Sequence, residues 1–195
     1  MPAVATEKPA AFAVWITGLP ASGKSTLASA LNAQLAGRGI DAAVLESDEL
    51  RRVFTPDPHY DENERAAFYR QMVYVGALLV RHGVPVIFDA TANRRLWREE
   101  ARQAIPQFIE VYVNSALEVC MARDPKGIYQ RARQGAASSV PGLQSPYEPP
   151  ERPDIEVRGD REAPEAAAQR VLAKLIEKRF VRSDIANIPA PAHPA

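Results

Sequence analysis

The sequence predicts one α/β domain with a central parallel sheet of about five strands, helices on both faces and a lid. Two observations carry this prediction. Short apolar segments typical of buried strands alternate with longer amphipathic segments typical of helices. A glycine-rich motif also lies between the first such strand and the first helix. At 195 residues and 46% hydrophobic content, the chain is large enough for one core of ordinary size.

The motif runs from residue 18 to residue 26 and fits the pattern G-x-x-x-x-G-K-[ST] without a gap. The apolar segment 12–17 precedes it, and residues 27–35 follow with helical spacing. Gly18 and Gly23 allow the backbone to curl, so that its N–H groups point at phosphate oxygens. We expect ATP to be bound by Gly18, Leu19, Pro20, Ala21, Ser22, Gly23, Lys24, Ser25 and Thr26. Lys24 would reach the β- and γ-phosphates, and the Ser25 hydroxyl would ligate Mg²⁺.

The remaining elements follow in alternation. Further strands are expected at 41–45, 84–88, 108–113 and 155–157. Helices are expected through 50–53, over 62–82, in the arginine-rich stretch after residue 93, and over 116–122, 127–133 and 163–180. Residues 135–153 are rich in Gly, Ser and Pro, and such a long connection favours a binding loop. Together with the basic stretch before it, it predicts a lid at about 126–153. The Ala- and Pro-rich ends, 1–10 and 182–195, are predicted to be tails around a domain at 11–181.

The overall charge excludes some partners. Lys and Arg number 24, as do Asp and Glu, so no global field attracts nucleic acid or an anionic membrane. The single cysteine, Cys120, excludes a disulfide framework and is expected to be a buried apolar side chain. No apolar run approaches membrane-spanning length, and the N-terminus does not have the pattern of a secretion signal. We therefore expect a cytoplasmic protein whose partners are small nucleotides.

Two polar residues follow the second strand with helical spacing. Asp48 and Arg51 are one turn apart, so they share a side of the helix. A carboxylate here could accept the proton of an attacking hydroxyl, while an arginine could bind an anionic group of the acceptor in a bidentate manner. The alternative is a helix-capping aspartate beside a surface arginine.

Other charged residues fall at strand ends and on helices. Asp89 ends an apolar strand as a Walker B carboxylate does, so it could hold Mg²⁺ directly or through water. The alternative is a capping role for the turn that follows. Lys126 and one or both of Arg131 and Arg133 are expected to face the phosphates, because they precede the long loop. The arginines at 94, 95, 98 and 102 are interpreted mainly as a solvated helix face. The histidines, at 59, 82 and 193, are not spaced as metal ligands.

Taken together, these motifs resemble the adenylylsulfate kinase family of P-loop kinases over about residues 14–157. The likeness rests on segments 15–19, 108–113, 117–120, 123–129 and 145–148, and on Asp48-x-x-Arg51. The resemblance implies transfer of the γ-phosphate of ATP to the 3′-hydroxyl of adenosine 5′-phosphosulfate (APS), with Asp48 as catalytic base and Mg²⁺ as cofactor. It implies acceptor contacts from Arg51, Arg65 and Lys126, stacking of Tyr60 on the acceptor's adenine, and ATP contacts from Arg123 and Arg131. Members of the family often form dimers, so a homodimer is possible.

Departures from the family cluster on the acceptor side. Phe68 replaces an asparagine that touches substrate, and Val140 replaces a second stacking phenylalanine. The family's Asp-Gly-Asp is here the segment 46–48, and its Phe-Ile-Ser-Pro is the segment 89–93. Ala92 stands where the family has a serine that is sometimes phosphorylated, which excludes a phosphoenzyme there. Positions expected to meet the acceptor are Arg51, Tyr60, Arg65, Phe68, Thr91, Ala92, Lys126 and Val140.

Two alternatives stay open. The same chemistry could serve another nucleotide-like or small hydroxyl acceptor, because the segment 89–93 also resembles the strand end of polynucleotide-kinase-like P-loop enzymes. Neutral charge argues against a long nucleic acid in that role. The chain could also be a non-catalytic nucleotide-binding module, although such a module would not need a base beside an arginine.

Overall fold

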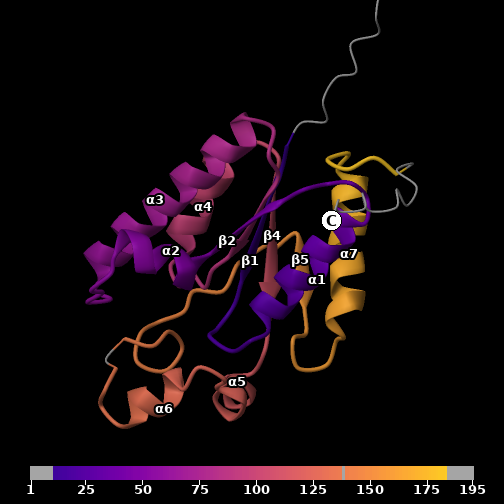
Figure 1. Cartoon of the computed structure of the whole chain (residues 1–195). Coiled ribbons are helices and arrows are strands. Elements are labelled where there is room, and N and C mark those ends of the chain that lie inside the picture. The colour runs from indigo at the N-terminus through magenta and orange to yellow at the C-terminus, as the bar shows by residue number, and fades with distance from the viewer. Residues whose placement is uncertain (1–10, 138, 184–195) are drawn as a thin grey trace, which may run out of the picture.

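The computed structural model describes residues 11–137 and 139–183, and its centre is a five-stranded parallel sheet (Figure 1). The strands are β1 (Ala13–Thr17), β2 (Ala43–Glu46), β3 (Val86–Asp89), β4 (Phe108–Val113) and β5 (Ile155–Val157), in the order β2-β3-β1-β4-β5. The helices are α1 (Lys24–Ala36), α2 (Ser47–Phe54), α3 (Glu62–Arg81), α4 (Arg95–Ala104), α5 (Leu117–Arg123), α6 (Ile128–Arg133) and α7 (Pro164–Glu177). The predicted α/β class is confirmed.

Strand β1 lies at the centre of the sheet because it is apolar on both faces. All five of its residues are buried. It pairs with β3 on one side and with β4 on the other, and Val14 lies level with Ile87 and Ile109. From β1 the chain passes to β2 at one edge of the sheet, returns to β3 beside β1, and then crosses to β4 and β5 on the other side. The carboxyl ends of β1 and β3 therefore lie at a switch point of the kind where α/β proteins bind ligands.

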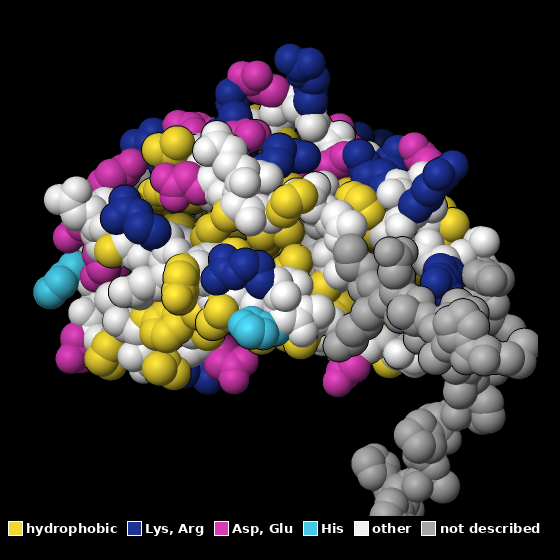
Figure 2. All heavy atoms as spheres, turned by 90° about the horizontal axis from the view of Figure 1, so that it is seen from above, with side chains coloured by type: hydrophobic (Ala, Val, Ile, Leu, Met, Phe, Trp, Pro, Cys, Tyr) yellow, Lys and Arg dark blue, Asp and Glu magenta, His cyan; other side chains and the backbone are white. Residues whose placement is uncertain are grey.

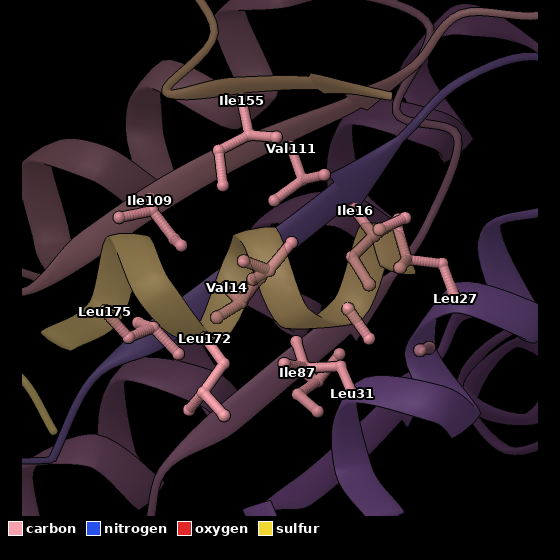
Figure 3. Close-up of a cluster of buried hydrophobic side chains, with 14 of the residues drawn as sticks. Val14, Ile16, Leu27, Leu31, Ile87, Ile109, Val111, Ile155, Leu172 and Leu175 are labelled. Carbon is pink, nitrogen blue, oxygen red and sulfur yellow. The ribbon is translucent and has the colours of Figure 1, made fainter. Parts of the chain in front are cut away.

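Two apolar layers cover the two faces of the sheet. Figure 3 shows Val14 and Ile16 pointing toward Leu31 of α1 and Leu172 of α7. Because side chains alternate along a strand, Trp15 points the other way, into a second cluster with α3 and α4. Gly76 allows the close approach of α3, since a Cβ there would lie 2.1 Å from Cζ of Phe88.

The arginine-rich helix α4 is more than a solvated face, and the prediction is wrong for Arg98. Its guanidinium is fully buried, and Nε donates to Oε1 of Glu110 at 2.6 Å. Nη2 donates to the carbonyl of Glu148 at 2.6 Å, and Nη1 donates to that of Ala92. A carboxylate on the buried strand β4 requires this partner. By contrast, Arg94 and Arg95 form partly exposed ion pairs with Glu62, Glu148 and Glu151.

The segment 126–153 packs on the domain. Val140 is buried with Cys120, Tyr129 and Ala132, and a Cβ at Gly142 would lie 2.5 Å from Leu19 of the glycine-rich loop. The tail predictions for 1–10 and 184–195 lie outside the described residues, whereas residues 182–183 are exposed. Figure 2 shows cationic and anionic side chains interspersed on one face, in keeping with a formal net charge of zero.

Candidate active site

The glycine-rich loop connects β1 to α1, as the motif requires. Gly18 has φ of 151°, and a Cβ there would lie 2.6 Å from the Val113 carbonyl oxygen. Gly23 adopts a left-handed conformation with φ of 109° as the N-cap residue of α1. Such backbone favours glycine. The loop therefore leads the chain tightly into the helix, whose N-terminal N–H groups face the site.

Three polar side chains of the motif and of β3 meet beyond the sheet edge. Lys24 is buried, and its Nζ donates to the Leu19 carbonyl at 2.9 Å. Burial lowers the pKa of Lys24, while the charges of Asp89 and Asp48 oppose this shift. Burial raises the pKa of Asp89, against the opposing effects of Lys24 and of a hydrogen bond with the Ser25 side chain. Asp89 caps no helix, because α4 has Arg94 as its N-cap residue.

A cavity of about 670 Å³ opens beside this cluster, a size that suits a nucleotide. Its wall is formed by Pro20, Ala21, Gly23 to Leu27, 46–48, Asp89, Thr91, Val113, 123–126, Ile128, Val157, 159–164 and Ala167. Arg123 and Lys126 both line the cavity. Arg131 does not, since its guanidinium donates to the Lys126 carbonyl at 2.8 Å.

Residues 159–164, which follow β5, were not predicted from the sequence to belong to the site. These residues line the cavity, and a Cβ at Gly159 would lie 2.4 Å from the carbonyl oxygen of Ser22. Gly159 therefore lies directly against the glycine-rich loop. The signal available in the sequence was Gly159, two residues after the last predicted strand, because ligands bind at the ends of strands in α/β folds.

Asp48 lies on the cavity wall and pairs with Lys126. Its Oδ2 accepts from Lys126 Nζ at 2.6 Å, while Glu46 Oε1 lies 3.4 Å from the same nitrogen. These bonds raise the pKa of Lys126, the one to Asp48 most. Asp48 is the second residue of α2, whose N-cap residue is Glu46, so it is not a capping aspartate. A half-exposed carboxylate on the wall can therefore meet a substrate hydroxyl.

Arg51 is not a surface arginine. Its guanidinium is buried over the Phe68 ring, 3.9 Å from the centroid, and Nη1 pairs with Glu64 Oε1 at 3.2 Å. It does not line the cavity that Asp48 lines. The shared helix therefore places the two residues in different surroundings, with Arg51 against α3.

Tyr60 and Arg65 lie beside Arg51. Tyr60 is exposed, whereas Arg65 is buried. Burial lowers the pKa of Arg65. Arg65 donates to the carbonyl of Tyr60 at 2.9 Å, to Oδ1 of Asn93 at 3.3 Å and to the carbonyl of Ser139 at 2.7 Å. Asn93 in turn donates to the Pro146 carbonyl at 3.0 Å. Arg65 and Asn93 thus fasten the segment 126–153 to α3, a role that the sequence did not reveal.

Of the other expected acceptor residues, one lines the cavity and three are buried. Thr91 lines the cavity, and its carbonyl accepts from the Thr17 hydroxyl at 2.7 Å. Ala92 is fully buried, with its N–H donated to the Tyr69 hydroxyl at 3.0 Å. Phe68 and Val140 are only 1% and 5% exposed. These three side chains are packed against neighbouring residues of the domain.

Tyr147 connects the same segment to β1. Its hydroxyl lies 3.1 Å from Oγ1 of Thr17, and burial raises the pKa of its phenol. Among the described residues no cluster of three or more His, Cys, Asp or Glu side chains could hold a metal ion. In the same residues, no helix is long and apolar enough to cross a membrane.

The chain is similar to proteins of one kind over most of its length. The family model described as adenylylsulphate kinase matches residues 10–158. The adenylyl-sulfate kinase of Microcystis aeruginosa is 41% identical over 173 residues, 89% of this chain and 96% of that protein. A probable adenylyl-sulfate kinase of Archaeoglobus fulgidus is 40% identical over 150 residues, 77% of this chain and 97% of that protein. The structure of the Mycobacterium tuberculosis APS kinase CysC in complex with AMPPNP and APS aligns with a TM-score of 0.81 at 34% identity, over 86% of this chain and 98% of that chain.

Proposed function

Because the chain belongs to the adenylylsulphate kinase family, we propose that it transfers the γ-phosphate of ATP to the 3′-hydroxyl of APS, with Asp48 as the base. The observation that carries this is one cavity lined by Lys24, Ser25 and Asp89 and by Asp48. The 3′-oxygen forms a bond to the γ-phosphorus as the bond to the β,γ-bridging oxygen breaks. The hydroxyl proton passes to the Asp48 carboxylate, and ADP leaves.

On the donor side, the glycine-rich loop and Lys24 hold the triphosphate. Buried beside Asp89, Lys24 places its charge where screening by water is weak. Mg²⁺ would be held by the Ser25 hydroxyl and the Asp89 carboxylate, which are oxygen ligands of the kind it prefers. When bound, it neutralises charge on the β- and γ-phosphates. We assign a further ATP contact to Arg123, which lines the cavity outside the loop.

On the acceptor side, Lys126 has a double role. In the free protein it pairs with Asp48 at 2.6 Å, and the resemblance assigns it to the acceptor. An anionic acceptor competes for the Lys126 ammonium group and thereby frees the base. Tyr60 offers an exposed ring to the acceptor's base, while Arg51 and Arg65 place two guanidinium groups within 5.1 and 5.5 Å of that ring's centroid.

A coupled assay of ADP release with Mg-ATP and APS tests the proposal. Asp48→Asn keeps the side-chain size but cannot take the proton, so kcat should fall about 10²- to 10⁴-fold. Glu49→Gln, at the next and exposed position of α2, is the matched control and should keep wild-type turnover. Wild-type turnover no higher than that of Asp48→Asn, with ATP still bound, would contradict the proposed reaction.

A second acceptor is the alternative that the structure keeps open. Phe68 and Val140, where the family has substrate-touching residues, are buried in this chain. Stacking of a base on an aromatic side chain contributes about 1–3 kcal/mol. With only Tyr60 to stack on, the adenine of APS would be selected less strongly than with two aromatic faces. The same assay with a panel of nucleotide-like and small hydroxyl acceptors separates the two proposals. ATP binding without turnover on any of them would favour a non-catalytic module.

Four further properties belong to this proposal. A metal requirement is tested by chelation, since EDTA should abolish turnover and added Mg²⁺ should restore it. We propose a homodimer on the basis of the family resemblance, and sedimentation of the purified chain tests it. A cytoplasmic location is proposed from the sequence, whose single cysteine excludes a disulfide framework. The domain at 11–181 with a lid at about 126–153 is supported by the buried contacts of Val140 and Gly142 beside the glycine-rich loop.

A further inference from the structure

The carboxylate of Glu64, in the first turn of α3, accepts hydrogen bonds from three groups. Asp61 is the N-cap residue of α3, and its side chain accepts from the Glu64 N–H at 2.9 Å. In an ordinary capping box, Glu64 would bond back to the N–H of Asp61. Here its carboxylate accepts from the N–H groups of His59 and Tyr60, and from Arg51 Nη1 at 3.2 Å. Glu64 thus does more than cap a helix, because it reaches α2 and the connection between the two helices.

The connection is held in an uncommon backbone conformation. Tyr60 has φ of +59°, in the left-handed region that tyrosine seldom adopts. Its N–H is held by Glu64 at 3.3 Å, and its carbonyl accepts from Arg65 Nε at 2.9 Å. Such conformations persist where the surroundings determine them, and they cluster at functional sites. The outcome is a Tyr60 residue that is 42% exposed, with Arg51 5.1 Å from its ring centroid.

The same carboxylate therefore sets two candidate recognition groups. One is an exposed aromatic face, and the other is the Arg51 guanidinium, which is held between Glu64 and the Phe68 ring. An acceptor nucleotide offers a base for the first and an anionic group for the second. Groups that are fixed before binding lower the ordering cost of recognition.

We propose that Glu64 is a positioning residue for the acceptor, which fixes the Tyr60 ring and the Arg51 guanidinium relative to each other. The inference rests on the proposed function for the identity of the acceptor, a nucleotide that carries a second anionic group. It does not require Glu64 to touch the acceptor, and it assigns Glu64 no part in binding ATP.

The test compares Glu64→Gln with Glu62→Gln. Glutamine at 64 keeps the length of the side chain but loses its charge and one of its two acceptor oxygens. Glu62 lies in the same helical turn, where its carboxylate pairs with Arg94 at the surface, so it is a matched control. Hydrogen exchange of the amides at 59 and 60 should become about tenfold faster in Glu64→Gln only. The KM for APS should rise about tenfold, while kcat and the KM for ATP stay within about twofold of wild type.

Two results would overturn the inference. One is unchanged exchange at residues 59 and 60 in Glu64→Gln. The other is an equal rise in the KM values for APS and ATP with a lowered melting temperature, which would indicate general loosening of the fold. If the wild-type protein fails to turn over APS, the proposed acceptor is wrong, and the exchange measurement alone then decides whether Glu64 holds Tyr60.

Discussion

Replacing Arg98 by methionine should destabilise the domain more than any surface charge change on α4. Methionine keeps most of the apolar volume but leaves Glu110 buried without its partner, 2.6 Å away in the wild type. Removing one member of a buried ion pair costs about 3–5 kcal/mol. Arg102, 3.4 Å from the other Glu110 oxygen, offsets part of this loss, so the lower end of that range is expected. The carbonyls of Ala92 and Glu148 also lose a donor.

Urea and thermal unfolding measure the effect. A loss of about 3 kcal/mol corresponds to about 6–12 °C in melting temperature for a domain of this size. Arg95→Met is the matched control, because its exposed pair with Glu151 is worth at most about 1 kcal/mol. The double variant Arg98→Met/Glu110→Gln removes the orphaned charge and should recover more than about 1 kcal/mol. A loss below about 1 kcal/mol in Arg98→Met would refute the reasoning that this ion pair braces β4 against α4.

Three further outcomes are expected. Lys24→Ala should lower kcat about 10²- to 10³-fold, as loss of one preorganised charge donor does, and fluorescence titration should show weaker ATP binding; unchanged affinity and rate would exclude Lys24 from the site. Gly159→Ala should raise the KM for ATP and cost about 1–3 kcal/mol in unfolding free energy, because the new Cβ would lie 2.4 Å from the Ser22 carbonyl; wild-type kinetics would show that the loop yields freely. The Arg95 N–H and Arg94 lower the pKa of Glu148 below its ordinary 4.5. The stability contributed by Glu148 is therefore present above pH 4.5 and is lost as the pH falls through the folded-state pKa of this carboxyl. Glu148→Gln should flatten this part of the curve of unfolding free energy against pH, and an unchanged curve would contradict the prediction.

The residues of the proposed donor half of the site could be chosen from the sequence because they are close together in the chain or lie at the ends of predicted strands. The spacing of Gly18, Gly23 and Lys24 lies within one loop, and the flanking apolar periods identify β1 and α1. Asp89 could be found because it ends an apolar strand, and the carboxyl ends of the strands in a parallel sheet lie at one edge, where ligands bind. Each of these inferences needs only neighbours in the chain or the general geometry of the fold.

The rest depends on contacts between distant elements. Arg98 and Glu110 lie on different elements, so a run of arginines alone could not distinguish the buried member from the exposed ones. The same holds for Arg65, whose partners Asn93 and Ser139 lie far along the chain. Periodicity reports which face of a helix is apolar, but it does not report which charged side chain finds a buried partner.

Because three of the departures from the family are buried, we expect acceptor identity to depend on the groups beside them, Arg51 and Tyr60. Ala92, Phe68 and Val140 are all packed, so their differences act through the groups they support. Phe68 is the clearest case, because its ring lies 3.9 Å from the Arg51 guanidinium and sets where that charge sits. If this chain selects an acceptor other than APS, we expect the cause to lie in Arg51 on the Phe68 ring and in the single aromatic face at Tyr60. Lys24, Asp48 and Asp89 share one cavity whichever hydroxyl is phosphorylated.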